Sequence, residues 1–286
     1  MAFSRSNVGD CLMKYTKENG LYIPDYSDRN LCSFTPGIMP IISAQGPPLA
    51  NLQVWWDLAS QTGYADTDTI VALTDFSGNS NDSSPGSGGM AYRTTTVTVN
   101  GLPVAYFNGV GNIINTVTPF FGGLDTSAWT AATLAVVGRA TVDPGASAST
   151  SGQWQTVYPN DYTVAIFSTL TWHADGVIYD ANFTTATKTT GDPTDSLASP
   201  FLYLLTSTDG AWTLRINGVQ HYTTATNTFI GNSEATYPSL RIGYSERNGA
   251  NSEFRGVVGE VLLYDAVVSG GDLTQLETYL MSKWAI

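Results

Sequence analysis

The stretch Gly256-Val-Val-Gly-Glu-Val-Leu-Leu-Tyr-Asp265 decides the fold of this chain. It is an apolar run bracketed by glycines and rich in Val, Leu and Tyr, which favours a buried strand over a short helix. After Ser269-Gly-Gly-Asp272, an apolar stripe follows at helical spacing, and Asp272 is placed to cap the helix start. The stripe consists of Leu273, Leu276, Tyr279, Leu280 and Trp284. The sequence therefore predicts a strand over 256–265 followed by an amphipathic helix.

The strongest local signal upstream is the hairpin Ala211-Trp-Thr-Leu-Arg-Ile-Asn-Gly-Val-Gln-His-Tyr222. Asn217-Gly218 supplies the two positive-φ residues of a type I′ turn between alternating strands. Trp212, Leu214 and Ile216 should then share one face of the sheet. Further strands are predicted at 52–57, from Ile70 onward, and at 94–99, 133–137, 162–170, 177–179, 201–206 and 240–242.

The words Gly259-Glu-Val-Leu-Leu-Tyr-Asp265 and Glu277-Thr-Tyr-Leu-Met-Ser-Lys-Trp284 closely resemble the closing signature of laminin-G-like, concanavalin-A-like jelly-roll domains. Trp55-Trp56-Asp57, the Asx-rich stretch 75–82 and the segment 102–109 resemble the opening half of the same family. The resemblance implies an all-β, two-sheet antiparallel jelly-roll sandwich over residues 51–286, with a short C-terminal helix. Such domains mostly bind rather than catalyse.

Length and composition limit the possible fold, partners and location of the protein. At 286 residues and 42% hydrophobic the chain can bury a full core, and only 13% of its residues are charged. The net charge of −12 without a basic cluster argues against nucleic acid as a partner. No apolar stretch approaches the roughly 18 residues that span a bilayer. The first ten residues lack the apolar centre of a secretion signal, so we expect the chain either to stay in the cytoplasm where it is made or to leave by another route, such as cell lysis.

Residues 1–50 differ from the rest of the chain, because repeated prolines break regular elements and favour an extended arm. The arm is too apolar for disorder alone, so we expect it to order against a partner surface. Its docking residues would be Leu12, Tyr15, Leu21, Tyr22 and Tyr26. Cys11 and Cys32 lack zinc-site spacing; they are either unpaired thiols or a bond within the arm or to a neighbouring subunit.

The same sandwich also supports glycoside hydrolases, whose catalytic residues follow recognisable patterns. In jelly-roll glucanases the paired carboxylates come from a strand motif Glu-x-Asp-x-x-Glu, and this chain has none. Its nearest strand acid, Glu260, is isolated and is interpreted as a turn or edge carboxylate. His173 and His221 accompany no Gly-x-Ser-x-Gly elbow. We therefore expect no enzyme.

Two binding sites are candidates. Four oxygen-bearing side chains within eight residues, Asp75, Asn79, Asn81 and Asp82, could form either a Ca²⁺ loop or a plain Asx-rich turn. Exposed aromatic residues beside a low-complexity segment at 143–152 could stack against pyranose rings. These glycan candidates are Trp154, Tyr158, Tyr162 and Trp172, whereas Trp55, Trp56, Trp212 and Trp284 are assigned to the core.

The function predicted from the resemblance is that of a phage virion surface protein. The arm at 1–50 would attach it to capsid or tail proteins, the jelly roll would project outward as a homo-oligomer, and host glycans are possible ligands. It would be located on the virion surface. The alternatives are a secreted or cell-surface lectin or adhesin domain and a polysaccharide hydrolase with an unrecognised site.

Overall fold

The computed structural model of the chain describes residues 15–18, 21–24, 46–85, 90–108, 114–116, 124, 126–141, 154–157, 168–172, 177–180, 182–231, 241–242 and 254–286. The chain divides into two compact units, Met1–Ser43 and Ala44–Ile286. In the first unit, β1 (Tyr15–Glu18) and β2 (Leu21–Pro24) pair as an antiparallel hairpin. Leu12 and Tyr26 lie outside the described residues, so the docking role of the arm stays a prediction.

The larger unit is built on an antiparallel sheet of eight strands, called here the large sheet. Its order is β15-β14-β13-β8-β17-β6-β5, with β3 also paired to β17. The strands are β3 (Leu52–Asp57), β5 (Ala91–Arg93), β6 (Val104–Asn108), β8 (Ala131–Ala140), β13 (Phe201–Thr208), β14 (Ala211–Ile216), β15 (Val219–Thr224) and β17 (Arg255–Tyr264).

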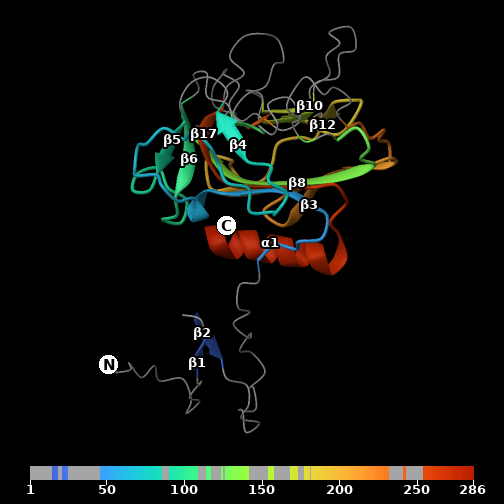
Figure 1. Cartoon of the computed structure of the whole chain (residues 1–286). Helices are drawn as coiled ribbons and strands as arrows, with labels where there is room; N and C mark the ends of the chain where they lie inside the picture. The colour runs from blue at the N-terminus through green and yellow to red at the C-terminus, as the bar shows by residue number, and fades with distance from the viewer. Residues whose placement is uncertain are drawn as a thin grey trace, which may run out of the picture. The chain divides into compact units, whose positions relative to one another are not determined.

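A second antiparallel sheet of seven strands has the order β12-β11-β10-β9-β16-β7-β4. Its strands are β4 (Ser83–Pro85), β7 (Ile114–Thr116), β9 (Trp154–Val157), β10 (Ser168–Trp172), β11 (Ile178–Asp180), β12 (Lys188–Thr189) and β16 (Arg241–Ile242). Figure 1 shows the two sheets as stacked layers, with helix α1 (Gly270–Trp284) against the opposite face of the large sheet. The predicted all-β sandwich with a C-terminal helix is confirmed. Within the described residues, no helix has the length and apolar character needed to cross a bilayer.

The decisive stretch forms β17, which is central to the large sheet. β17 pairs with β8 along most of its length, with β6 through its first half and with β3 through its second half. It is buried from Gly256 to Tyr264, because one face meets the second sheet and the other meets α1. An uninterrupted apolar run, rather than an alternating one, is what a strand covered on both faces requires.

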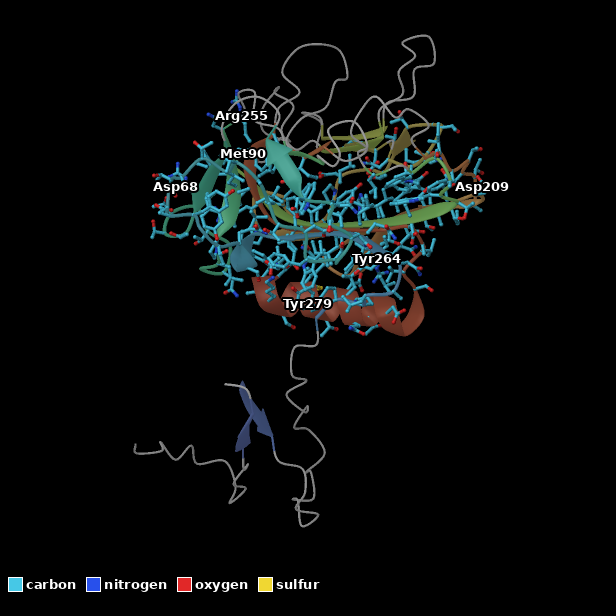
Figure 2. The ribbon with its side chains drawn as sticks, viewed as in Figure 1. Asp68, Met90, Asp209, Arg255, Tyr264 and Tyr279 are labelled. Atoms are coloured by element: carbon cyan, nitrogen blue, oxygen red, sulfur yellow. The ribbon has the colours of Figure 1, made fainter. Side chains whose placement is uncertain are left out.

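Two hydrophobic cores hold the layers together (Figure 2). The first lies between the sheets and includes Trp56, Leu134 and Trp212. The second lies between the large sheet and α1 and includes Leu262, Leu280 and Trp284. The predicted hairpin is also confirmed, since Asn217 and Gly218 have φ of 50° and 75° and Trp212, Leu214 and Ile216 are buried.

Three details differ from the sequence predictions. The N-cap of α1 is Ser269, which makes no side-chain cap bond, and Asp272 lies in the first turn instead. Residues 94–99 form no strand: the Asp66 carboxylate accepts the backbone N–H groups of Thr94 and Thr95, and these bonds lower the pKa of Asp66. The predicted strand from Ile70 onward is replaced by isolated bridges, one just before it at Thr69 and one within it at Leu73.

Candidate functional site

The Asx-rich loop predicted as a possible Ca²⁺ site covers the outer edge of β3. Asp75 Oδ1 accepts the backbone N–H of Trp55 at 2.8 Å and of Ser77 at 2.9 Å. Asp75 Oδ2 accepts the hydroxyl of Ser77 at 2.6 Å and the backbone N–H of Asn81 at 2.9 Å. Both carboxylate oxygens are therefore already occupied by donors of the chain itself.

The other three candidates also bond to the chain itself: Asn79 and Asn81 to β3, and Asp82 within the loop. Asn79 Nδ2 donates to the Leu52 carbonyl and Asn81 Nδ2 to the Gln53 carbonyl, each at 2.7 Å, while Asp82 Oδ1 accepts the Asp75 N–H at 2.7 Å. Asp75, Asn79 and Asn81 thus bond to the backbone edge of β3 in place of a neighbouring strand. No group of three or more His, Cys, Asp or Glu side chains that could hold a metal ion occurs in the part of the chain that the structure describes. The contacts of Asp75 support the turn interpretation, and a calcium site at this loop stays a prediction.

Two of the four predicted glycan residues, Trp154 and Trp172, belong to the second sheet. Trp154 lies in β9 opposite Ile242 of β16, and Trp172 lies in β10 opposite Ile178 of β11. Tyr158 and Tyr162 fall outside the described residues, as does His173. The glycan-binding role of these four aromatic residues stays a prediction.

Glu260 is not the turn or edge carboxylate that the sequence suggested; it is fully buried between β17 and α1. Its Oε1 accepts the indole N–H of Trp55 at 2.7 Å and the hydroxyl of Tyr279 at 2.8 Å. Its Oε2 accepts the indole N–H of Trp284 at 2.7 Å and the ammonium of Lys283 at 2.8 Å. One carboxylate thus joins β3, β17 and α1.

Asp57 makes this cluster a pair of acids. Lys283 Nζ also lies 2.7 Å from Asp57 Oδ1, so one ammonium bridges the two carboxylates. Burial raises the pKa of Glu260 and the charge of Asp57 raises it further, whereas Lys283 opposes the shift. Glu260 is 0% and Asp57 3% exposed, so this pair is closed to a substrate. The arrangement attaches α1 to the sheet and does not resemble two acids facing each other across a cleft.

A second buried carboxyl lies between the sheets. Asp180 Oδ1 accepts the backbone and side-chain N–H groups of Asn182 at 2.6 and 2.9 Å, and the Tyr203 hydroxyl donates to Oδ2. Burial raises the pKa of Asp180 to about 8, against the two hydrogen bonds from Asn182, which lower it. At neutral pH the group is therefore mostly protonated and acts as a core hydrogen-bonding group.

A surface depression of ≈ 440 Å³ beside Trp55 is a further binding candidate. It lies where the chain enters the large sheet, next to the first turns of α1. Its walls are Gly46, Pro47, Pro48, Leu49, Ala50, Trp55, Asp272 and Gln275. We call it the Trp55 depression.

The aromatic wall of the depression corrects the assignment of Trp55 to the core. Along β3 the burial alternates, so Trp56 is fully buried between the sheets while Trp55 lies half-buried on the helix side. The Trp55 ring packs edge-on against Phe76 at 6.0 Å and Tyr279 at 6.3 Å between ring centroids. Its N–H is held by Glu260. The indole is therefore fixed in position before any ligand arrives.

The rim of the depression offers hydrogen-bond acceptors. Gln275 Nε2 donates to the Gly46 carbonyl at 2.8 Å, which orients the amide. No described residue donates to the Gln275 carbonyl oxygen or to the exposed Asp272 carboxylate. Leu49 is 67% exposed beside them. Sequence reasoning missed this site because its members lie more than 200 positions apart, and only the Trp55-Trp56 pair, which an alternating strand must split between two faces, signals it.

Comparisons with known proteins bear on the fold. No protein-family model matches the chain, and no curated protein matches it. Among solved structures it is similar to the binding domain of Paraclostridial Mosquitocidal Protein 1, with a TM-score of 0.56, 13% identity, and 82% of this chain and 53% of that chain covered.

Two further similarities involve glycoside-related proteins. Domain 4 of AbnA, an extracellular arabinanase of Geobacillus stearothermophilus solved with arabinotriose, matches with a TM-score of 0.52 and 14% identity, covering 79% of this chain and 98% of that one. Trypanosoma rangeli sialidase in complex with sialic acid matches with a TM-score of 0.53 and 14% identity, covering 82% of this chain but 34% of the sialidase. These matches support the jelly-roll-type sandwich, and membership of the laminin-G-like family stays a prediction.

Proposed function

We propose that this protein is a carbohydrate-binding β-sandwich domain without catalytic activity of its own, and that the Trp55 depression holds the sugar. The observation that carries the proposal is the composition of that depression. It combines a fixed indole, an apolar wall of prolines and, on one rim, two acceptors to which no described residue donates.

Each part matches one feature of a sugar. The apolar C–H face of a pyranose or furanose ring stacks on an aromatic ring, and its hydroxyl groups donate to carboxylate and amide oxygens. Pre-ordering matters here because immobilising a flexible side chain reduces affinity. Trp55 bonded to Glu260 and Gln275 bonded to Gly46 are both ordered in advance.

The comparisons support the same class of ligand. The AbnA domain, matched over 98% of its length, was solved with a trisaccharide bound. The proposal of a non-catalytic role is supported by the burial of Asp57 and Glu260, which removes the acid pair bridged by Lys283 from contact with a substrate. Attachment to a virion through residues 1–50 and homo-oligomerisation gain no support from the comparisons and stay predictions.

Filling the depression tests the proposal directly. Ala50 is exposed on its wall and makes no side-chain hydrogen bond, so Ala50→Phe should occupy the sugar position without breaking a contact. Ala128→Phe, at an exposed turn outside the depression, is the matched control. On a glycan array and by titration calorimetry with arabinotriose and lactose, wild type and the control should bind, and Ala50→Phe should lose at least about tenfold in affinity. Equal binding by all three proteins would place the sugar elsewhere, and no binding by wild type would reject the proposal.

A further inference from the structure

We infer that the Trp55 depression selects neutral and amino sugars over sialic and uronic acids, and that Asp272 sets this selectivity. The inference rests on the proposed function and adds the class of sugar. It follows from the charges around the depression rather than from its shape.

Asp272 is the one charged residue among the residues lining the depression. The cations of its neighbourhood are already engaged. Lys283, the single basic residue of α1, contacts Asp57 and Glu260 at 2.7 and 2.8 Å, and Arg215 is bound to Glu277 at 2.6 Å. Among the described residues, a sugar carboxylate in the depression would therefore meet a carboxylate without meeting an unpaired cation.

The start of α1 would otherwise favour an anion. The helix has 15 residues, and its N-cap Ser269 makes no side-chain cap bond. First-turn N–H groups carry the equivalent of about half a positive charge, which attracts anions. Asp272 places a full negative charge in that same first turn, which exceeds the half positive charge of the helix start, so we expect a negative electrostatic potential at the depression. Removal of the Asp272 charge should make the electrostatic potential at the depression positive.

The magnitude follows from Coulomb's law. Two unit charges about 5 Å apart in a water-like dielectric change a binding constant by on the order of fivefold. Salt reduces that factor, because the Debye length falls from about 10 Å at 0.1 M to a few ångströms at 1 M. A selectivity that vanishes at high salt is thus a signature of this mechanism.

The experiment uses the full chain with Asp272→Asn and, as a control of equal net charge, Asp192→Asn at an exposed position outside the depression. The probes are lactose against 3′-sialyllactose and N-acetylchitotriose against chitotriose, each titrated at low and high salt. Wild type and Asp192→Asn should favour lactose over sialyllactose and chitotriose over its acetylated form. Asp272→Asn should shift the first affinity ratio by about fivefold toward 3′-sialyllactose and the second by about fivefold toward N-acetylchitotriose.

The outcomes separate the two claims. Wild type that binds sialyllactose as well as lactose, or an Asp272→Asn variant with unchanged ratios, overturns the selectivity while leaving sugar binding intact. Wild type that binds none of the four probes overturns the proposed function and the selectivity with it. A shift shared by Asp192→Asn assigns the effect to net charge and also overturns the role of Asp272.

Discussion

Replacement of Glu260 by Gln should cost far more stability than any exchange of an exposed acid. The wild-type carboxylate accepts from Trp55, Tyr279, Lys283 and Trp284, two donors on each oxygen. A glutamine amide has one oxygen, and its NH₂ group cannot accept. Whichever way the amide is turned, one indole N–H is left buried without an acceptor.

The cost can be worked from these bonds. An unsatisfied buried donor costs about 1–3 kcal/mol, and a lost hydrogen bond to a charged group contributes about 1.5–3 kcal/mol. Lys283 keeps Asp57 as a partner, which limits the loss. We expect a decrease of about 3–6 kcal/mol in the free energy of unfolding, a large share of the roughly 5–15 kcal/mol typical of a domain.

Urea denaturation at pH 7, followed by tryptophan fluorescence and far-ultraviolet circular dichroism, measures the change. The matched control is Glu277→Gln on the same helix, which breaks the partly exposed contact with Arg215 and should cost about 1 kcal/mol or less. If Glu260→Gln is no more damaging than this control, the carboxylate does not join the helix to the sheet as described.

Three further predictions concern the cores. An added Cβ at Gly259 would lie 2.6 Å from two Trp284 ring carbons, so Gly259→Ala should lose about 1–3 kcal/mol, and a double-mutant cycle with Trp284→Phe should show partial relief. Because Asp180 has a raised pKa of about 8, the folded state holds its proton while the unfolded state releases it near 3.8, so stability falls by up to about 1.4 kcal/mol per pH unit as pH rises between these values. In urea titrations from pH 5 to 8, the free energy of unfolding of Asp180→Asn should lack this pH dependence, so the variant should become more stable relative to wild type as pH rises. Parallel plots of the free energy of unfolding against pH for the two proteins would contradict the raised pKa. The Tyr264 hydroxyl is buried and has no hydrogen-bond partner among the described residues, so Tyr264→Phe should leave the melting temperature unchanged or raise it, whereas Tyr203→Phe should lower it.

The C-terminal strand, the helix and the hairpin turn were predictable because their sequence signals are local. The apolar run at 256–265 predicts a strand, the apolar stripe of α1 predicts a helix, and Asn217-Gly218 predicts a turn, each from neighbouring residues alone. The role of Glu260 was not predictable. Its partners come from β3, 205 residues earlier, and from a helix 19–24 residues later. The register also shifts between Val258 and Glu260, an irregularity that an alternating pattern does not reveal.

The Asx-rich loop shows a different limit of sequence reasoning. Asn and Asp side chains carry oxygens that suit calcium, and the same groups also donate to or accept from a backbone. The decision depends on whether an unpaired strand edge lies beside them, which is a tertiary fact. Here β3 provides that edge, and Asn79 and Asn81 turn their N–H groups toward its carbonyls. The sequence correctly located the turn but could not show what it covers.

The central place of β17 has a consequence for biosynthesis. Strands β3, β6 and β8 leave the ribosome well before β17, yet each of them has β17 as a neighbour. Until that late strand emerges, their edges are open to association with other nascent chains. Translation speed and chaperone supply should therefore influence the yield of this protein more than that of a domain whose neighbouring strands follow one another along the chain.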